Sequence, residues 1–237
     1  MSEWKSKRFW TTVDVEEHED GYAVTLDKRL VKTPAKVTLK TPTRALAEAL
    51  AKEWDAQEDV VRPASMPFTR MANSAIDKVV PQQGGVCSEV AGFGGSDLIC
   101  YRADAPEGLV AVQAKAWDPL VDWSATALSA PLRITSGVIP VAQPEESLVA
   151  LAARVEAATA FELAALHDLT SLSGSLVIGL AAAEGWGDPD DLWSRSRTDE
   201  LWQIAQWGPD EEAEATAELK RQAFLHAFEF YRLSQNA

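Results

Sequence analysis

The stretch EWDAQEDVVRPASMPFTRMANSAID, residues 53–77, combines one tryptophan, five acidic residues, two prolines, two arginines and one asparagine. It contains no histidine, cysteine or glycine, the residue types that metal sites, nucleophilic sites and phosphate loops most often use. The composition therefore argues against a role in catalysis. We expect this stretch to connect two structurally different parts of the chain.

Strand patterns precede the stretch. Residues 9–15 (FWTTVDV) are rich in β-branched and aromatic side chains, and residues 22–26 (YAVTL) alternate apolar and polar with a period of two. Residues 19–21 (EDG) between them are typical of a turn. Further short strands are expected at residues 30–33 and 37–40.

Helical periodicity begins at Thr43, which is a suitable N-cap for residues 44–57. Further helices are expected at residues 109–128, 144–165, 166–183, 190–207 and 211–233. The fold class is therefore predicted to be α+β. We expect a β-rich N-terminal domain with a connecting helix, residues 1–80, and a larger, mainly α-helical C-terminal domain, residues 81–237.

The composition restricts the class of function. Apolar residues make up 46% of the chain, and no apolar run approaches the roughly 18 residues that span a membrane. The N-terminus lacks a secretory leader pattern, so we expect a cytoplasmic, bacterial protein. The net charge is −14, with +2 on residues 1–45 and −16 on the remainder. The acidic remainder argues against nucleic-acid binding and suits solubility or a basic partner.

No catalytic, metal-binding or cofactor motif is recognisable. The chain has no G-x-S-x-G elbow and no phosphate loop, and residues 92–96 (GFGGS) lack the dinucleotide spacing. Its three histidines are far apart in sequence, and its two cysteines, 13 positions apart, are expected to be reduced, buried thiols. We therefore expect no cofactor, no metal and no enzymatic activity.

The expected helix at residues 190–207 has an unusual face. At about 100° per residue, this face carries six side chains: Trp193, Arg197, Glu200, Leu201, Ile204 and Trp207. A carboxylate within an apolar stripe requires a partner. Either Arg197 and Glu200 form an ion pair at the edge of the stripe, or Glu200 is a polar contact in a groove that binds a partner.

Several motifs together resemble one family, the assembly chaperone of the F-type ATP synthase that receives the free α subunit of the catalytic head. EWDAQ (53–57) and MPFTRMAN (66–73) carry most of the resemblance. Further segments agree with it: RFW (8–10), VDV (13–15), VKTPAK (31–36), ICYR (99–102), WDP (117–119) and WG (207–208). The resemblance extends over residues 8–230.

The resemblance implies a non-enzymatic protein that binds and masks the α subunit until β subunits replace it. It also implies an important acid within residues 196–208, which is Asp199 or Glu200 here; the helical face favours Glu200. We expect a monomer. Its expected partner-binding residues are Glu200, Asp199, Trp193, Arg197, Ile204 and Trp207. The domain-coupling residues are expected in the opening stretch: Trp54, Asp55, Arg70, Asn73 and Asp77. The alternatives are a general acidic adaptor and a small carboxylate-dependent hydrolase.

Overall fold

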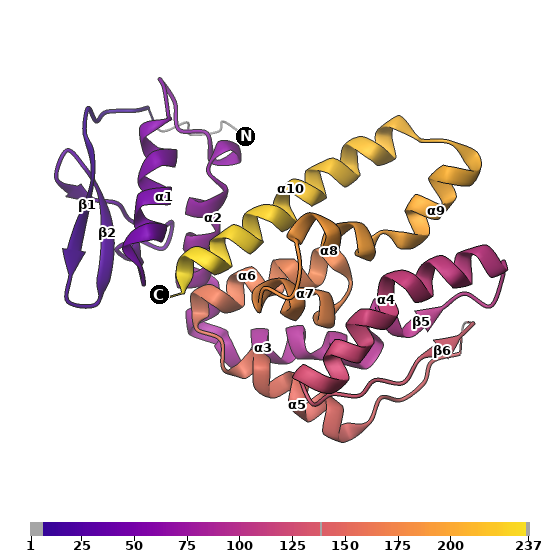
Figure 1. Cartoon of the computed structure of the whole chain (residues 1–237). Helices are drawn as coiled ribbons and strands as arrows, with labels where there is room; N and C mark the ends of the chain where they lie inside the picture. Colours follow the sequence, from indigo (N-terminus) through magenta and orange to yellow (C-terminus); the bar gives the residue numbers. More distant parts are fainter. Residues whose placement is uncertain (1–6, 138, 236–237) are drawn as a thin grey trace. The chain divides into compact units, whose positions relative to one another are not determined.

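The computed structural model describes residues 7–137 and 139–235 (Figure 1). Its contacts divide the chain into two compact units. The first comprises Met1–Gln83, Thr159–Ala165 and Glu229–Ala237, and the second comprises Gly84–Ala158 and Leu166–Phe228. The domain boundary at residue 80 stays a prediction. Residues 1–6, on which the leader prediction partly rests, lie outside the described residues.

The first unit contains a small antiparallel sheet. Its strands are β1 (Val13–His18), β2 (Gly21–Leu26), β3 (Arg29–Leu30) and β4 (Lys40–Thr41). Strand β2 pairs with each of the other three and has the most buried side chains. With this N-terminal sheet and a largely helical remainder, the predicted α+β class is confirmed.

Two turns explain the strand pairing. Gly21 has φ +135°, and an added Cβ would lie 2.4 Å from the carbonyl oxygen of Thr41, so only glycine fits. Asp27 and Lys28 both have positive φ, as a tight two-residue hairpin requires. The Asp27 carboxylate accepts hydrogen bonds from the backbone N–H of Thr12 at 2.9 Å and of Thr11 at 3.0 Å, which lowers its pKa to about 2.

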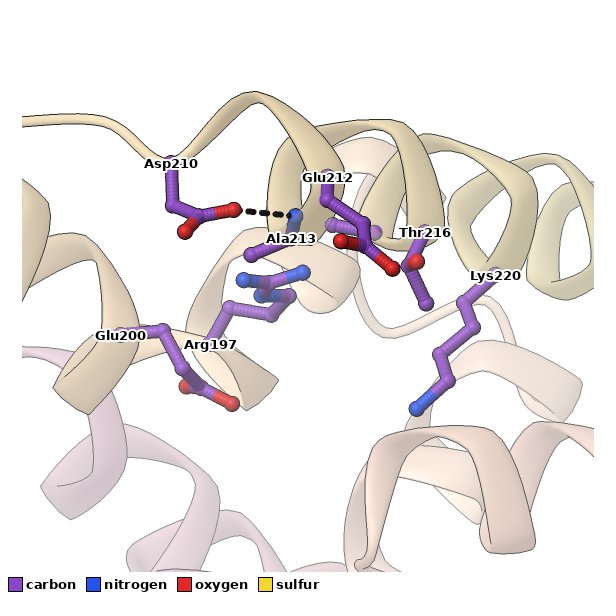
Figure 2. Close-up of a pocket in the computed structure, with 8 residues that line it drawn as sticks. Arg197, Glu200, Asp210, Glu212, Ala213, Thr216 and Lys220 are labelled. Carbon is purple, nitrogen blue, oxygen red and sulfur yellow. Dashed lines mark hydrogen bonds between the residues drawn. The ribbon is translucent and has the colours of Figure 1, made fainter.

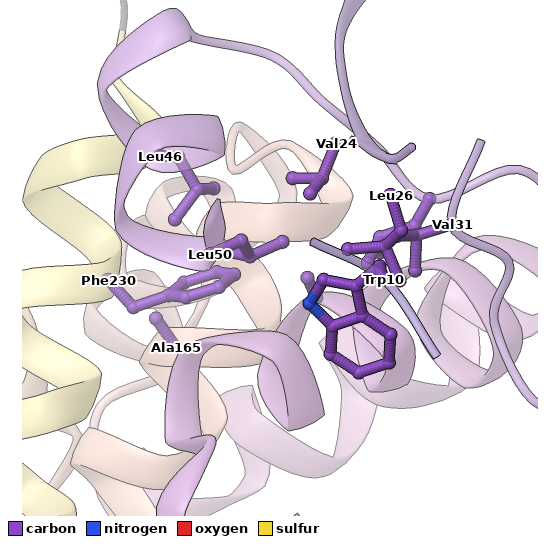
Figure 3. Packing of buried hydrophobic residues seen from close by; sticks show 10 residues of the cluster. Trp10, Val24, Leu26, Val31, Leu46, Leu50, Ala165 and Phe230 are labelled. Carbon is purple, nitrogen blue, oxygen red and sulfur yellow. The ribbon is translucent and has the colours of Figure 1, made fainter. Parts of the chain in front are cut away.

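Helix α1 (Arg44–Asp55) covers the sheet. Thr43 caps it, because its Oγ1 accepts the Leu46 N–H at 3.1 Å. Leu46 and Leu50 are fully buried in a cluster that also holds Trp10 and Phe230 (Figure 3). The remaining buried members of the cluster are Val24, Leu26, Val31, Leu39, Ala72 and Ala165.

The opening stretch joins α1 to α2 (Pro67–Ser74). The Glu53 carboxylate accepts the N–H groups of Phe68 and Thr69, both at 2.8 Å, and so caps the N-terminus of α2. Burial raises the pKa of Glu53, although these hydrogen bonds oppose the effect. Glu53 of α1 therefore caps the helix that begins at Pro67, within the segment MPFT.

The same stretch makes two further ties within the first unit. Gln57 is buried; its Oε1 accepts the Arg62 N–H at 2.7 Å, and its Nε2 donates to the Glu53 carbonyl at 3.0 Å. Asp77 accepts hydrogen bonds from the Thr33 hydroxyl at 2.6 Å and the Ala35 N–H at 3.0 Å. The dense polar residues thus join α1, α2 and the strand region.

The second unit is mainly helical. It contains α3 (Gln83–Gly92) from Gly84 onward, α4 (Glu107–Ala127), α5 (Glu145–Glu156), α7 (Leu176–Ala183), α8 (Pro189–Ser196) and α9 (Thr198–Trp207). Helices α6 (Ala160–Ser173) and α10 (Glu211–Ser234) contribute residues to both units. Strands β5 (Tyr101–Arg102) and β6 (Thr135–Ser136) form a short parallel pair. No helix within the described residues is both long and apolar enough to cross a membrane.

A buried carboxylate organises the start of α7. Asp97 is 0% exposed, and it accepts the N–H of Ile99 at 3.2 Å and of Val177 at 3.0 Å. Its desolvation raises its pKa to about 6, against the opposing effect of these hydrogen bonds. Ser175 caps the same helix through the Ile178 N–H. The carboxylate therefore ties residues 97–99 to α7.

Helix boundaries differ from the sequence prediction between residues 144 and 183. We predicted one boundary, at residue 165; the chain instead breaks after α5 and again between α6 and α7. Gly174 ends α6 with φ +71°, and Ser175 begins the next helix as its cap. The helices predicted at 109–128 and 211–233 are confirmed as α4 and α10.

Candidate partner-binding site

The single helix predicted over residues 190–207 is wrong. The chain breaks at Arg197, where φ is −110° and ψ is 21°, so that α8 ends before it and α9 begins after it. The Ser196 hydroxyl donates to the Trp193 carbonyl at 2.6 Å, and the Thr198 hydroxyl donates to the Arg195 carbonyl at 2.8 Å. These local bonds compete with continued helical hydrogen bonding. The predicted stripe is therefore divided between two helices.

Trp193 and Arg197 lie at this break. Trp193 is only 6% exposed and packs against Phe224 of α10, with ring centroids 5.6 Å apart. The Arg197 guanidinium lies 6.0 Å from the centre of the Trp193 ring. Its Nε is buried and has no hydrogen-bond partner within the described chain, and no ion pair joins it to Glu200 there. Of the two alternatives for Glu200, the ion pair with Arg197 is therefore not formed in the described chain.

Asp199 and Glu200 have different surroundings. Asp199 Oδ1 accepts a hydrogen bond from Gln113 Nε2 at 2.7 Å, and Gln113 Oε1 accepts the Ala103 N–H at 2.8 Å. Gln113 is only 2% exposed, so Asp199 satisfies a buried donor on α4. Glu200 is exposed. Asp199 thus fixes α9 to α4, whereas the adjacent Glu200 makes no such contact and is exposed.

Close packing supports the α4–α9 contact. Gly108 at the start of α4 faces Trp202, and an added Cβ would lie 2.5 Å from the Trp202 indole. On the outer side of α9, Leu201 is 48% exposed and Trp207 is 79% exposed, whereas Ile204 is half-buried. One side of α9 is therefore held by α4, and the other presents large apolar side chains.

A cavity of about 520 Å³ lies between the start of α9 and the N-terminal half of α10. We call it the α9–α10 groove (Figure 2). Its charged lining residues are Arg197, Glu200, Asp210, Glu212 and Lys220, and the others are Ala213, Thr216 and Ala217. Asp210 caps α10, because it accepts the Ala213 N–H at 2.8 Å. Figure 2 shows Arg197 extending toward α10, and Glu212, Thr216 and Lys220 extending from α10 toward the space between the two helices.

Two sequence motifs of the second unit meet at one place. Arg102 of ICYR donates to Asp118 of WDP at 2.9 Å and lies 5.2 Å from the centre of the Trp117 ring. Trp117 is fully buried and donates its Nε1–H to the Arg195 carbonyl at 2.8 Å. These residues position the end of α8, just before the break at Arg197. Their role is structural support for the site.

The predicted domain-coupling residues make their described bonds inside the first unit. Trp54 packs edge-on against Trp10, with ring centroids 5.4 Å apart, and Asp55 lies 3.3 Å from Arg8. Asp77 accepts hydrogen bonds from Thr33 and Ala35 of the strand region. Arg70 is exposed, and the Asn73 side-chain oxygen is buried without a hydrogen-bond partner in the described chain. Domain coupling stays a prediction.

Sequence reasoning missed four residues of functional interest: Glu53, Gln113, Glu212 and Lys220. Glu53 was visible as part of EWDAQ, but its capping role requires knowing that α2 begins beside it. Gln113 is a polar residue within an expected helix, which carries no signal of its own. Glu212 and Lys220 lie on one face of α10, but only the turn between α9 and α10 brings them to Arg197.

The described residues contain no group of three or more histidine, cysteine, aspartate or glutamate side chains that could hold a metal. Both cysteines are free and buried, as predicted. Burial raises the pKa of Cys100 to about 12, with a smaller contribution from Asp97, so this thiol remains protonated and unreactive at neutral pH.

Comparison with known proteins identifies the family. A family model described as ATP12 chaperone protein matches residues 7–125. The chain is similar to the structure of Atp12 from Paracoccus denitrificans, at 50% identity and a TM-score of 0.95, covering 98% of this chain and 100% of that one. An aspartate-to-lysine mutant of the P. denitrificans protein matches at 50% identity and a TM-score of 0.96, covering 99% and 100%. The Atu1473 protein from Agrobacterium tumefaciens matches at 39% identity and a TM-score of 0.92, covering 97% and 86%. The chain belongs to the ATP12 chaperone family.

Proposed function

We propose that this protein is a chaperone for assembly of the catalytic head of the F-type ATP synthase, and that it binds and masks the unassembled α subunit until β subunits replace it. Membership of the ATP12 chaperone family carries this proposal. The resemblance of residues 53–57 and 66–73 to the α-binding assembly chaperone supports the choice of client. The protein acts by binding and needs no cofactor.

The surface of α9 and α10 suits this task. A subunit destined for a ring exposes apolar interface, which aggregates unless it is covered. Trp207 is 79% exposed, Leu219 is 74% exposed and Leu201 is 48% exposed, so the two helices offer apolar contacts of their own. Acidic side chains surround them, which limits self-association. Such a surface binds a client with moderate affinity and releases it to its proper partner.

Within the predicted partner-binding set, the residues have different roles. Glu200, Ile204 and Trp207 contact the client. Asp199 acts indirectly, because its bond to Gln113 holds α9 in place. Trp193 is buried and packs against Arg197, which lines the groove.

We further propose that the protein works as a monomer in a bacterial cytoplasm, because the client-binding surface must remain free. Residues 1–80 and 81–237 act as its two domains. The stretch around Trp54 couples them, a role that uses the same tight hydrogen bonding that Glu53 and Asp77 provide within the first unit.

The test is a pull-down from the native cytoplasm with this protein as bait, at low and at high salt. We expect recovery of the α subunit without β at both salt concentrations, because apolar masking is only weakly screened. If the catch is instead a mixture of basic proteins that disappears at high salt, the protein is a general acidic adaptor.

A charge-reversal pair tests the site. Glu200→Lys should weaken binding of the α subunit about tenfold or more, as expected when a central interface charge is reversed, and should leave the melting temperature unchanged because Glu200 is exposed. Glu211→Lys, also exposed, makes the same change of charge outside the groove and should bind normally. Unfolding of the Glu200 variant would show a structural role instead.

A further inference from the structure

The charged side chains that line the α9–α10 groove are not paired with one another. The ion pairs nearby join other residues: Arg195 bonds Asp191 at 2.7 Å, and Arg221 bonds Asp190 at 2.6 Å and Glu218 at 3.0 Å. Within the described parts of the chain, no ion pair involves the five charged residues of the groove. Arg197 even leaves its buried Nε without a hydrogen-bond partner. The groove therefore keeps its charges available for an external group.

The balance of these charges selects the sign of the ligand. The lining has three acidic residues against two basic ones, a net charge of −1. A bound cation brings the net charge of the groove to zero, whereas a bound carboxylate would make it more negative, at −2. Because Asp210 already caps α10, Glu200 and Glu212 are the acceptors that remain free.

The charged residues around the groove also favour a positively charged ligand. Residues 197–220 contain seven aspartates and glutamates against two basic residues. Such a field attracts basic groups and repels acidic ones before contact is made. Leu219 and Trp207, both largely exposed on the same two helices, offer apolar contacts beside the acids.

We propose that the α9–α10 groove receives an arginine or lysine side chain from an apolar segment of the client, with Glu200 and Glu212 as its acceptors. The client is the α subunit, so this inference rests on the proposed function. Ala213 and Ala217 leave the room that the side chain enters. Arg197 and Lys220 stay in the groove and reduce its attraction for a cation, which keeps the contact replaceable when the β subunit arrives.

The experiment uses three variants of the full chain. Glu212→Lys reverses an acid of the groove. Ala217→Leu fills the groove without changing its charge and keeps a good helix former. Glu214→Lys is the matched control, because it reverses an exposed acid on the same helix that does not line the groove. Far-ultraviolet circular dichroism and melting establish that each variant folds. Glu212→Lys changes the charge of the groove and Ala217→Leu changes its volume. If one of these two variants misfolds, the other still tests the proposal.

Each variant is titrated with two kinds of probe. The first is the purified α subunit. The second is a pair of amphipathic, leucine-rich synthetic peptides that are identical except that one carries arginine where the other carries glutamate. We expect the wild type to bind the arginine peptide at least about tenfold more tightly than the glutamate peptide. Glu212→Lys and Ala217→Leu should each weaken both the α subunit and the arginine peptide about tenfold, and Glu214→Lys should change neither more than about twofold.

Three results would overturn the proposal. If Glu212→Lys and Glu214→Lys weaken binding of the α subunit and the arginine peptide equally, only the overall negative charge of α9 and α10 matters, and the groove has no specific role. Unchanged binding by Ala217→Leu would show that the groove is not entered, and a preference for the glutamate peptide would make a carboxylate the ligand. If the wild type discriminates between the peptides but does not bind the α subunit, the groove stands and the proposed function fails. If the wild type binds the α subunit and all three variants bind it equally well, the proposed function is supported but the groove is not the binding site.

Discussion

Replacing Asp97 with asparagine should change how the stability of this protein depends on pH. Asp97 is fully buried, and its carboxylate accepts the N–H groups of Ile99 and Val177. Burial raises its pKa from 3.8 to about 6. Between these pH values the native state binds a proton that the unfolded chain has lost. Asparagine cannot titrate, so the variant lacks this contribution.

The sign and size of this pH dependence follow from the linkage between proton binding and folding. Where the native state binds more protons, the free energy of unfolding falls as pH rises, by up to about 1.4 kcal/mol per pH unit for one group. The contribution of Asp97 is fully present below pH 4 and is lost as pH rises through about 6. Over the whole window, the wild type should lose about 3 kcal/mol relative to Asp97→Asn.

The assay is urea unfolding of both proteins, followed by circular dichroism at a series of pH values from 4 to 7. Other carboxylates and His167 titrate in both proteins, so their contributions cancel in the difference between the two free energies. Asparagine accepts one N–H through its oxygen but presents an amide NH₂ to the other. This cost shifts the difference by a constant amount at all pH values and does not affect its slope.

The reasoning would be refuted if the difference stayed constant with pH to within about 0.5 kcal/mol, the accuracy of such extrapolations. A difference that moved in favour of the wild type as pH rises would be equally decisive. It would mean that the two N–H donors outweigh desolvation and hold the pKa of Asp97 below its ordinary value.

Three further predictions concern stability. Glu53→Gln should lower the free energy of unfolding by about 1–2 kcal/mol, because glutamine accepts only one of the two α2 N–H groups; exposed Glu48→Gln is the control, and equal melting of the two would contradict the capping role. Gly21→Ala should cost more than about 2 kcal/mol in the same measurement, since φ is +135° and a backbone carbonyl lies in the way; a normal melting temperature would refute this. Asp199→Ala should cost about 1–3 kcal/mol by leaving a buried amide unpaired, whereas Glu200→Ala should cost almost nothing, and equal losses would reject the division of roles.

Most elements of the fold were predictable because their periodicity is local. The alternation in residues 22–26 and the apolar spacing around Leu46 and Leu50 each identify an element without knowledge of its neighbours. Two of the errors have a common cause. The breaks at Arg197 and at Gly174 depend on hydroxyl and backbone hydrogen bonds that interrupt a sequence otherwise suited to one continuous helix.

The candidate site was less predictable, because its properties depend on which charged groups find partners in the folded chain. Asp199 and Glu200 are adjacent and chemically alike, and only Gln113, 86 positions earlier in the sequence, distinguishes them. Lysine at Asp199 would place a cation against a buried amide and act through the packing of α9. Lysine at Glu200 would leave that packing intact and act on the partner directly. A loss of binding in either variant therefore has a different physical origin, and melting measured beside binding separates the two.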